Sequence, residues 1–151
     1  MIAACLVALG VSAVASGEPV RTDDAGGRGL DAPRETERVT FAVFGDSVPG
    51  ASSGLSVVER AAETANQLGV RFVMTTGNMV QGDTSAGAWA ERVGEYRRAM
   101  SALSSPWYPV AGPLDYAIRS LDDGARAAAY RDQFGPMYYA FDSGWVEVFV
   151  L

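Results

Sequence analysis

The feature that most constrains the fold is an alternation of strand-like and helix-like apolar patterns from residue 39 onward. Runs rich in β-branched and aromatic residues at 39–44, 70–75 and 107–111 predict buried strands. Between them, the stretches 56–68 and 89–103 carry apolar residues at helical spacing. Strand, helix, strand, helix, strand implies right-handed crossovers and a parallel sheet. The sequence therefore predicts an α/β fold.

The two intervening helices carry different local signals. Ser56 and Glu59 fit a capping box at the start of the first, and Gly69 fits the left-handed residue that follows a helix end. The apolar face of the first helix is predicted to consist of Val57, Val58, Ala61, Ala65 and Leu68. Spacings of three and four predict that the core stripe of the second helix consists of Trp89, Val93, Tyr96, Met100 and Leu103.

The remainder of the chain predicts a helix over 125–134 and two strands at 138–141 and 145–151, joined near Asp142-Ser143-Gly144. The sequence stops inside the last predicted strand, so we expect a truncated domain over 39–151. An uncovered strand edge in such a domain would favour self-association.

The N-terminal stretch 2–15 is apolar and is followed by polar sequence. Its length and the small residues of Ala13-Val14-Ala15 predict a signal peptide over 1–15, and hence export to the periplasm or the cell exterior. A buried N-terminal strand or helix is the alternative, as is a lipoprotein signal ending at Cys5. Residues 16–38, which are polar and contain Gly26-Gly27, predict a flexible linker without packing.

Composition excludes several function classes. A net charge of −6 and a pI near 4.6 argue against a nucleic-acid-binding surface, which requires clustered Lys and Arg. The one cysteine, Cys5, lies in the predicted signal, so the mature domain would lack disulfide and thiol chemistry. The chain contains no histidine, which removes the usual general base near neutral pH and the commonest nitrogen ligand of metals.

Candidate functional residues follow the three parallel strands. Ligands of open α/β sheets bind beyond the carboxyl ends of the strands, so these segments should converge on one surface patch. Gly45, Gly77 and Gly112 would permit the tight turns that convergence requires. The segments are Phe44-Gly45-Asp46-Ser47-Val48, Thr76-Gly77-Asn78-Met79-Val80 and Ala111-Gly112-Pro113-Leu114-Asp115.

In order and spacing these segments resemble the motifs of the calcineurin-like metallophosphoesterases, in particular the exported purple-acid-phosphatase-like and phosphodiesterase-like branch. That family carries Asp-x-His, Gly-Asp and Gly-Asn-His-Asp or Gly-Asn-His-Glu after the three strands. The stretches 72–77 and 107–110 also fit, and 134–142 resembles the family's Phe-Gly-Pro-x-Tyr-Tyr-Ser-Phe-Asp segment. The resemblance covers about 40–151. It implies the N-terminal half of an αββα sandwich, with a βαβαβ parallel sheet followed by an antiparallel strand pair.

The resemblance also implies a mechanism in which two divalent metals, such as Fe, Mn or Zn, hold a hydroxide and clamp the phosphoryl oxygens. Asp46 matches the first metal-binding aspartate, whereas Val48 stands at the histidine position. Asn78 replaces the bridging aspartate, and its amide brings no negative charge to offset two dications. A weak Mg²⁺ or Ca²⁺ contact at Asp46 and Asn78 is one hypothesis. The other is that Asp46 caps a turn and Asn78 fills a left-handed position.

The third motif is altered further. Pro113 stands where the metal-binding asparagine is expected, and Leu114 stands where a histidine would protonate the departing oxygen. Only Asp115 remains of its polar end. We therefore expect no dinuclear centre, no bound cofactor and no intact catalytic residue. The favoured hypothesis is a catalytically silent exported domain that binds a partner or ligand; a residual metal-dependent phosphoester hydrolase and a truncated relic without independent function are the alternatives.

Other polar residues admit different hypotheses. Gly45-Asp46-Ser47 also matches the nucleophile block of GDSL-type lipases and esterases, but without a histidine base Ser47 is predicted to be a turn hydroxyl. Arg97 and Arg98 are predicted to lie on a solvated helix face. Four carboxylates are predicted to be solvated turn or cap residues rather than an acid–base pair: Asp83, Asp122, Asp123 and Asp142.

Overall fold

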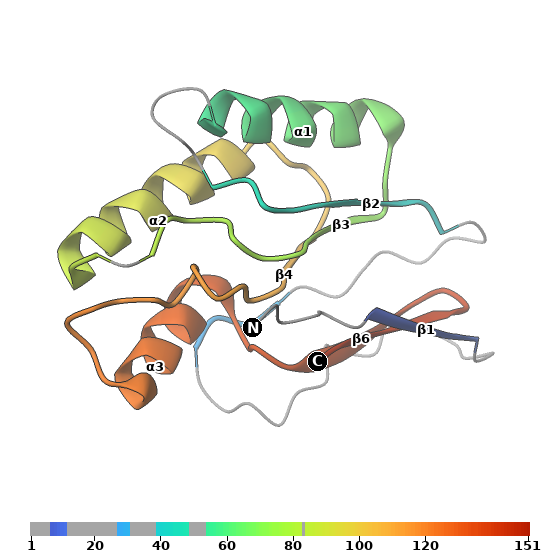
Figure 1. Cartoon of the computed structure of the whole chain (residues 1–151). Coiled ribbons are helices and arrows are strands. Elements are labelled where there is room, and N and C mark those ends of the chain that lie inside the picture. Colours follow the sequence, from blue (N-terminus) through green and yellow to red (C-terminus); the bar gives the residue numbers. More distant parts are fainter. Residues whose placement is uncertain (1–6, 12–26, 31–38, 49–53, 83) are drawn as a thin grey trace.

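Helices and two sheets form successive layers in the computed structural model, which describes residues 7–11, 27–30, 39–48, 54–82 and 84–151. Helices α1 and α2 lie on one side of a parallel sheet, and an antiparallel sheet lies on its other side (Figure 1). The predicted α/β class is confirmed. In chain order the elements are β1 (Val7–Val11), β2 (Phe41–Phe44), α1 (Gly54–Leu68), β3 (Phe72–Thr75), α2 (Ala86–Met100), β4 (Trp107–Pro109), α3 (Asp123–Phe134), β5 (Tyr139–Ser143) and β6 (Val146–Val150).

The parallel sheet has the strand order β2-β3-β4, as the alternating pattern predicts. Its central strand β3 is buried on both faces. Phe72 and Met74 belong to the core shared with the antiparallel sheet, whereas Val73 belongs to the core beneath the helices. Burial on both faces explains why β3 reads as a continuous apolar run rather than an alternating one.

The ends of α1 agree only in part with the sequence signals. The helix begins at Gly54, so Ser56 lies in its first turn and the predicted capping box is wrong. At the other end Gly69 has φ 61°, the left-handed conformation predicted for it. The N–H of Val70 donates to the carbonyl of Ala65 at 3.3 Å, which satisfies one of the last carbonyls of the helix.

The buried face of α1 is rotated from the predicted one. Val58, Ala62 and Ala65 are buried, whereas Val57 and Leu68 are 64% and 67% exposed. The predicted face mixed residues from both sides, because consecutive positions on a helix lie about 100° apart and small alanines mark no side clearly.

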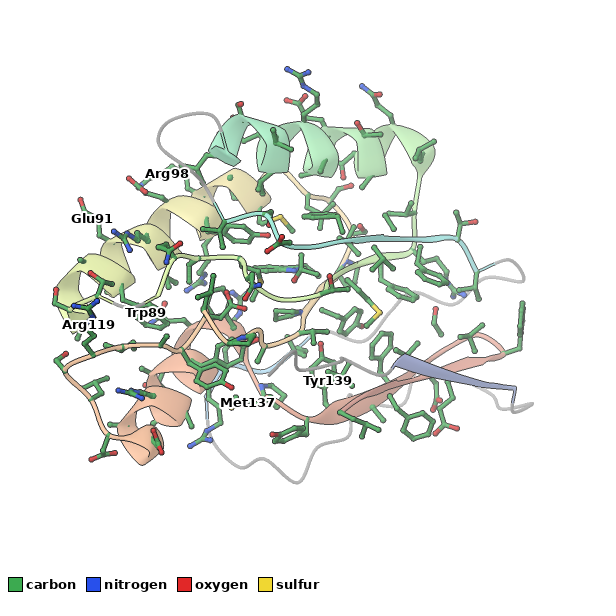
Figure 2. All side chains as sticks on the ribbon, in the orientation of Figure 1. Trp89, Glu91, Arg98, Arg119, Met137 and Tyr139 are labelled. Carbon is green, nitrogen blue, oxygen red and sulfur yellow. The ribbon has the colours of Figure 1, made fainter. Side chains whose placement is uncertain are left out.

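The predicted core stripe of α2 is confirmed. Trp89, Val93, Tyr96 and Met100 are buried, and Leu103 packs against the same core just beyond the helix. Figure 2 shows Glu91 and Arg98 on the outer side of this helix, away from Trp89. Ser85 caps the helix, because its hydroxyl accepts from the N–H of Ala88 at 3.4 Å.

A second core joins the two sheets through aromatic rings. Phe141 of β5 stacks on Tyr108 of β4 with ring centroids 3.8 Å apart, and it meets Phe72 edge-on at 5.2 Å. The hydroxyl of Tyr139 donates to the carbonyl of Pro109 at 2.8 Å. These contacts hold β4 against the antiparallel sheet and so fix the end from which the third candidate loop departs.

The antiparallel sheet has the order β1-β6-β5. Its hairpin turns between Ser143 and Val146, so Asp142 and Ser143 belong to β5 and not to the predicted turn. Val7–Val11, from the middle of the predicted signal peptide, forms β1 and pairs with β6. The last strand therefore has a neighbour on each side. The rest of the predicted signal, at 1–6 and 12–15, lies outside the described residues.

Part of the predicted linker also packs, contrary to the expectation for 16–38. The N–H of Arg28 donates to the carbonyl of Arg131 at 3.0 Å, and Leu30 packs against the core between the sheets. Gly135 has φ 100° and leaves no room for a Cβ beside the Arg28 carbonyl. The remaining linker residues, 16–26 and 31–38, lie outside the described residues. Among the helices described, none has the length and apolar character needed to cross a bilayer.

Candidate functional site

The three loops that follow β2, β3 and β4 meet at the carboxyl ends of the strands, as predicted. The N–H of Asp46 in the first loop donates to the carbonyl of Gly77 in the second at 3.0 Å. The N–H of Leu114 in the third loop donates to Oδ1 of Asn78 at 3.3 Å. The second loop therefore bridges the first and the third.

Glycines make this close approach possible. A Cβ on Gly77, which has φ 88°, would lie 2.6 Å from Cα of Gly112. A Cβ on Gly112 would lie 2.7 Å from Oδ1 of Asn78, and one on Gly45 would overlap the hydroxyl of Thr76. Gly77 and Gly112 are therefore needed for packing of backbone against backbone, and Gly45 is needed for the close approach of the Thr76 side chain.

We expect Gly77→Ala to lower the free energy of unfolding by about 2–3 kcal/mol, because it adds left-handed strain of roughly 1–2 kcal/mol to a clash with the Gly112 backbone. Urea denaturation measures the change. Gly94→Ala is the matched control, since Gly94 lies inside α2 with open space around it, and there alanine should stabilise by roughly 0.5–1 kcal/mol. Equal effects of the two substitutions would contradict the described packing.

Asp46 and Asn78 form the polar centre of the converged loops. Both have left-handed backbones, with φ of 51° and 52°, which confirms the conformation predicted for Asn78. Nδ2 of Asn78 donates to Oδ1 of Asp46 at 3.2 Å, while its Oδ1 accepts from Leu114. Both ends of one amide are thus used to hold the three loops together.

Asp115, the remnant of the third motif, is fully buried beneath this centre. Its Oδ1 accepts from the N–H groups of Met79 at 2.6 Å and Val80 at 3.0 Å, and its Oδ2 accepts from that of Gly112 at 2.8 Å. Its carbonyl accepts from the indole of Trp89 at 2.7 Å. Burial raises the pKa of Asp115 to about 6, and the amide donors limit the rise. Its role is to position the second and third loops.

The other motif positions bring no metal donor to the centre. Val48 and Leu114 are half-buried and Pro113 is exposed, and their side chains have no lone pair for a cation. In the part of the chain that the structure describes, no group of at least three His, Cys, Asp or Glu side chains is arranged to hold a metal ion.

Ser47 lies beside a phenol rather than a base. Its hydroxyl is 3.2 Å from that of Tyr96, whose pKa is raised to about 12 by burial and is also raised by the charge of Asp115. A phenol that holds its proton so firmly cannot activate a serine near neutral pH. The arrangement gives the esterase hypothesis no base at Ser47.

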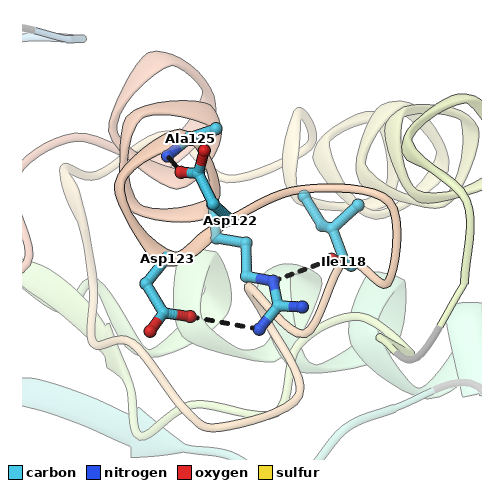
Figure 3. Close-up of polar contacts among 5 residues, drawn as sticks. Ile118, Asp122, Asp123 and Ala125 are labelled. Carbon is cyan, nitrogen blue, oxygen red and sulfur yellow. Dashed lines mark hydrogen bonds and ion pairs between the residues drawn. The ribbon is translucent and has the colours of Figure 1, made fainter.

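The two carboxylates at the start of α3 have different roles. Oδ1 of Asp122 accepts from the N–H of Ala125 at 2.9 Å, and Asp123 pairs with Arg126 at 3.2 Å (Figure 3). The guanidinium of Arg126 also donates to the carbonyl of Ile118 at 2.8 Å. The predicted cap role is confirmed for Asp122. Asp142 is a strand residue instead, and Asp83 lies outside the described residues.

The two adjacent arginines of α2 have different environments. Arg98 is exposed, as predicted. Arg97 is half-buried and donates from Nη1 to Oε1 of Gln133 at 3.1 Å, so the prediction of a solvated face is wrong for this residue.

No protein-family model matches the chain, and no curated protein matches it either, so the assignment of function depends on the residues themselves.

Proposed function

We propose that this chain is a calcineurin-like phosphoesterase domain, the N-terminal half of that family's αββα sandwich, in which metal-dependent catalysis has been lost and the loop surface is kept for binding. Support comes from the order of the motif segments and from their convergence at the ends of a parallel sheet. An antiparallel sheet packed on the opposite face from α1 and α2 is also in keeping with half of such a sandwich.

The observation that carries the proposal is the hydrogen bond from Asn78 to Asp46. Two facing carboxylates at this position would repel unless a cation lay between them, whereas an amide donates a hydrogen bond to the carboxylate directly. The oxygen of the same Asn78 amide accepts a second hydrogen bond, from the N–H of Leu114. The loops are thus closed by protein groups alone, and the closure needs no metal.

A two-metal reaction would also require ligands that these loops do not offer. Among the described residues, Asp46 is the one carboxylate at the polar centre, and both oxygens of Asp115 are engaged by backbone amides. A single carboxylate and a neutral amide supply too little charge to hold two neighbouring dications.

Substituting Asn78→Asp tests this reasoning. The substitution replaces the hydrogen bond to Asp46 by two carboxylates in contact with each other. We therefore expect the free energy of unfolding to fall by about 1–2 kcal/mol at neutral pH in EDTA. Millimolar Mn²⁺ or Mg²⁺ should restore much of that loss, while the melting temperature of the unmodified chain should be the same with and without metal. Differential scanning calorimetry provides both values.

Asn66→Asp is the matched control. Asn66 also joins two segments by its amide, donating to Ala102 and accepting from Ser104, but no carboxylate among the described residues forms a hydrogen bond with it. Its aspartate variant should lose stability without any response to metal. A rise in the melting temperature of the unmodified chain on adding Mn²⁺, with near-stoichiometric metal by elemental analysis, would refute the proposal.

The residual-hydrolase alternative has its own test. The purified chain is incubated with Mn²⁺ and a chromogenic phosphodiester, and no turnover above buffer is expected. Turnover that Asp46→Ala abolishes, while Asp132→Ala on the exposed side of α3 leaves it unchanged, would establish activity at these loops.

A further inference from the structure

A cavity of about 540 Å³ lies near the amino end of β4, and its walls include none of the motif-loop residues described above. Its walls come from the end of α2 and the segment after it, from β4, from the end of α3 and from the stretch 28–30. The volume falls within the range of about 300–1,000 Å³ usual for small-molecule sites. No sequence pattern predicts this cavity, because its walls come together only in the folded chain.

Two arginines line this cavity. Arg28 and Arg97 both line it, and among the described residues neither forms an ion pair with a carboxylate. Partial burial and the nearby charge of Arg28 lower the pKa of Arg97, although a guanidinium remains protonated. Like charges held side by side favour an anion that can lie between them.

The remaining walls combine serine hydroxyls with apolar side chains. Trp107 and Phe134 meet edge-on with ring centroids 6.0 Å apart, and Met100 lies with them in the cavity wall. The hydroxyl of Ser105 is buried and has no hydrogen-bond partner among the described residues, so it is free to accept or donate one. The cavity thus offers both hydrogen-bonding groups and an apolar ring to a ligand.

We propose that this cavity binds a small organic anion, with its phosphate or carboxylate between Arg28 and Arg97 and a flat apolar group against Trp107. The planar guanidinium, with its fork of donors, suits both oxyanions. The site is independent of the proposed function, because none of its lining residues belongs to the motif loops.

Isothermal titration calorimetry of the full chain with phenyl phosphate, benzoate, inorganic phosphate and phenol tests the proposal. We expect phenyl phosphate or benzoate to bind at least about tenfold more tightly than inorganic phosphate or phenol, because only they engage both kinds of wall. The preferred aromatic anion identifies the oxyanion. Amide chemical shifts should change over 103–107 and not at Asp46 or Asn78.

Matched variants test whether Arg28 and Arg97 are the residues that bind the anion. Arg97→Met and Arg28→Met should each weaken binding by about tenfold, the effect of removing one charge-assisted hydrogen-bonding group. Arg98→Met alters the adjacent residue of the same helix, which is exposed and outside the cavity, and should leave affinity unchanged. Because Arg28 is exposed, its variant keeps the test valid if Arg97→Met fails to fold.

Three results would overturn the proposal. The first is the absence of millimolar or tighter binding of either aromatic anion to the folded chain. The second is an equal loss in the Arg97→Met and Arg98→Met variants, which would indicate diffuse attraction. The third is a set of shift changes confined to the loops around Asn78, which would place the ligand at the other site.

Discussion

Replacing Asp115 with alanine is expected to lower the free energy of unfolding by about 3–5 kcal/mol, the largest effect of a single polar substitution in this chain. The carboxylate satisfies the backbone N–H groups of Met79, Val80 and Gly112, all buried. Each buried donor left without a partner costs roughly 1–3 kcal/mol. Urea denaturation followed by circular dichroism gives the value.

Two further variants make the expectation specific. Asp115→Asn should lower the free energy of unfolding less than Asp115→Ala does. The carbonyl oxygen of the new asparagine can still accept from Met79 and Val80, while the hydrogen bond from Gly112 is lost. Asp132→Asn, exposed on α3, should change stability by no more than about 0.5 kcal/mol. If Asp115→Ala behaves like Asp132→Asn, then Asp115 does not anchor the loops.

The same residue should contribute to the pH dependence of stability. Its pKa of about 6 in the folded protein lies above the ordinary value of 3.8, so the folded state binds the proton more tightly than the unfolded state. The stabilising contribution is fully present below pH 3.8 and is lost as pH rises through about 6, a change of roughly 3 kcal/mol at most. The free energies of unfolding of the wild type and of Asp115→Asn should converge as pH rises. A constant difference between them across this pH range would contradict the raised pKa of Asp115.

Replacing Phe141 with alanine is expected to lower the free energy of unfolding by about 3–5 kcal/mol, because it opens a cavity where the two sheets meet. Its ring is fully buried, stacks on Tyr108 and meets Phe72 edge-on. Thermal and urea unfolding measure the loss. Near-ultraviolet circular dichroism should also weaken, since the packing around Tyr108 changes.

The control for this aromatic core is Trp145→Ala. Trp145 lies in the turn between β5 and β6 and is 51% exposed, so its removal should cost less than about 1 kcal/mol. Phe141→Leu should be intermediate, because it keeps apolar volume but loses the ring contacts. A Phe141→Ala variant as stable as Trp145→Ala would show that the sheets do not pack through this ring.

Local patterns were sufficient to predict most of the fold. The stripe on α2 was clear because its members are large and lie at strict helical spacing, as Trp89 and Tyr96 show. The face of α1 was mistaken because Val57 and Val58 are equally apolar neighbours, and only packing decides which one is buried. Leu30 was missed because one leucine in a polar stretch has no periodicity.

One feature of the candidate site could likewise be predicted from the sequence, and another could not. Convergence of Gly45, Gly77 and Gly112 could be predicted, since the carboxyl ends of parallel strands share one edge of the sheet. The anchoring role of Asp115 could not, because its partners at Met79 and Val80 are distant in sequence and are identified only by tertiary contacts.

The pairing of β1 with β6 links the N-terminus of the chain to the integrity of its last strand. If a peptidase were to cut after Ala15, the residues that form β1 would leave with the released peptide, and the edge of β6 that had paired with them would open to solvent. That edge is five residues long and would accept a strand from another molecule. Processing would thus make β6 an edge strand of the sheet and an acceptor for strand exchange.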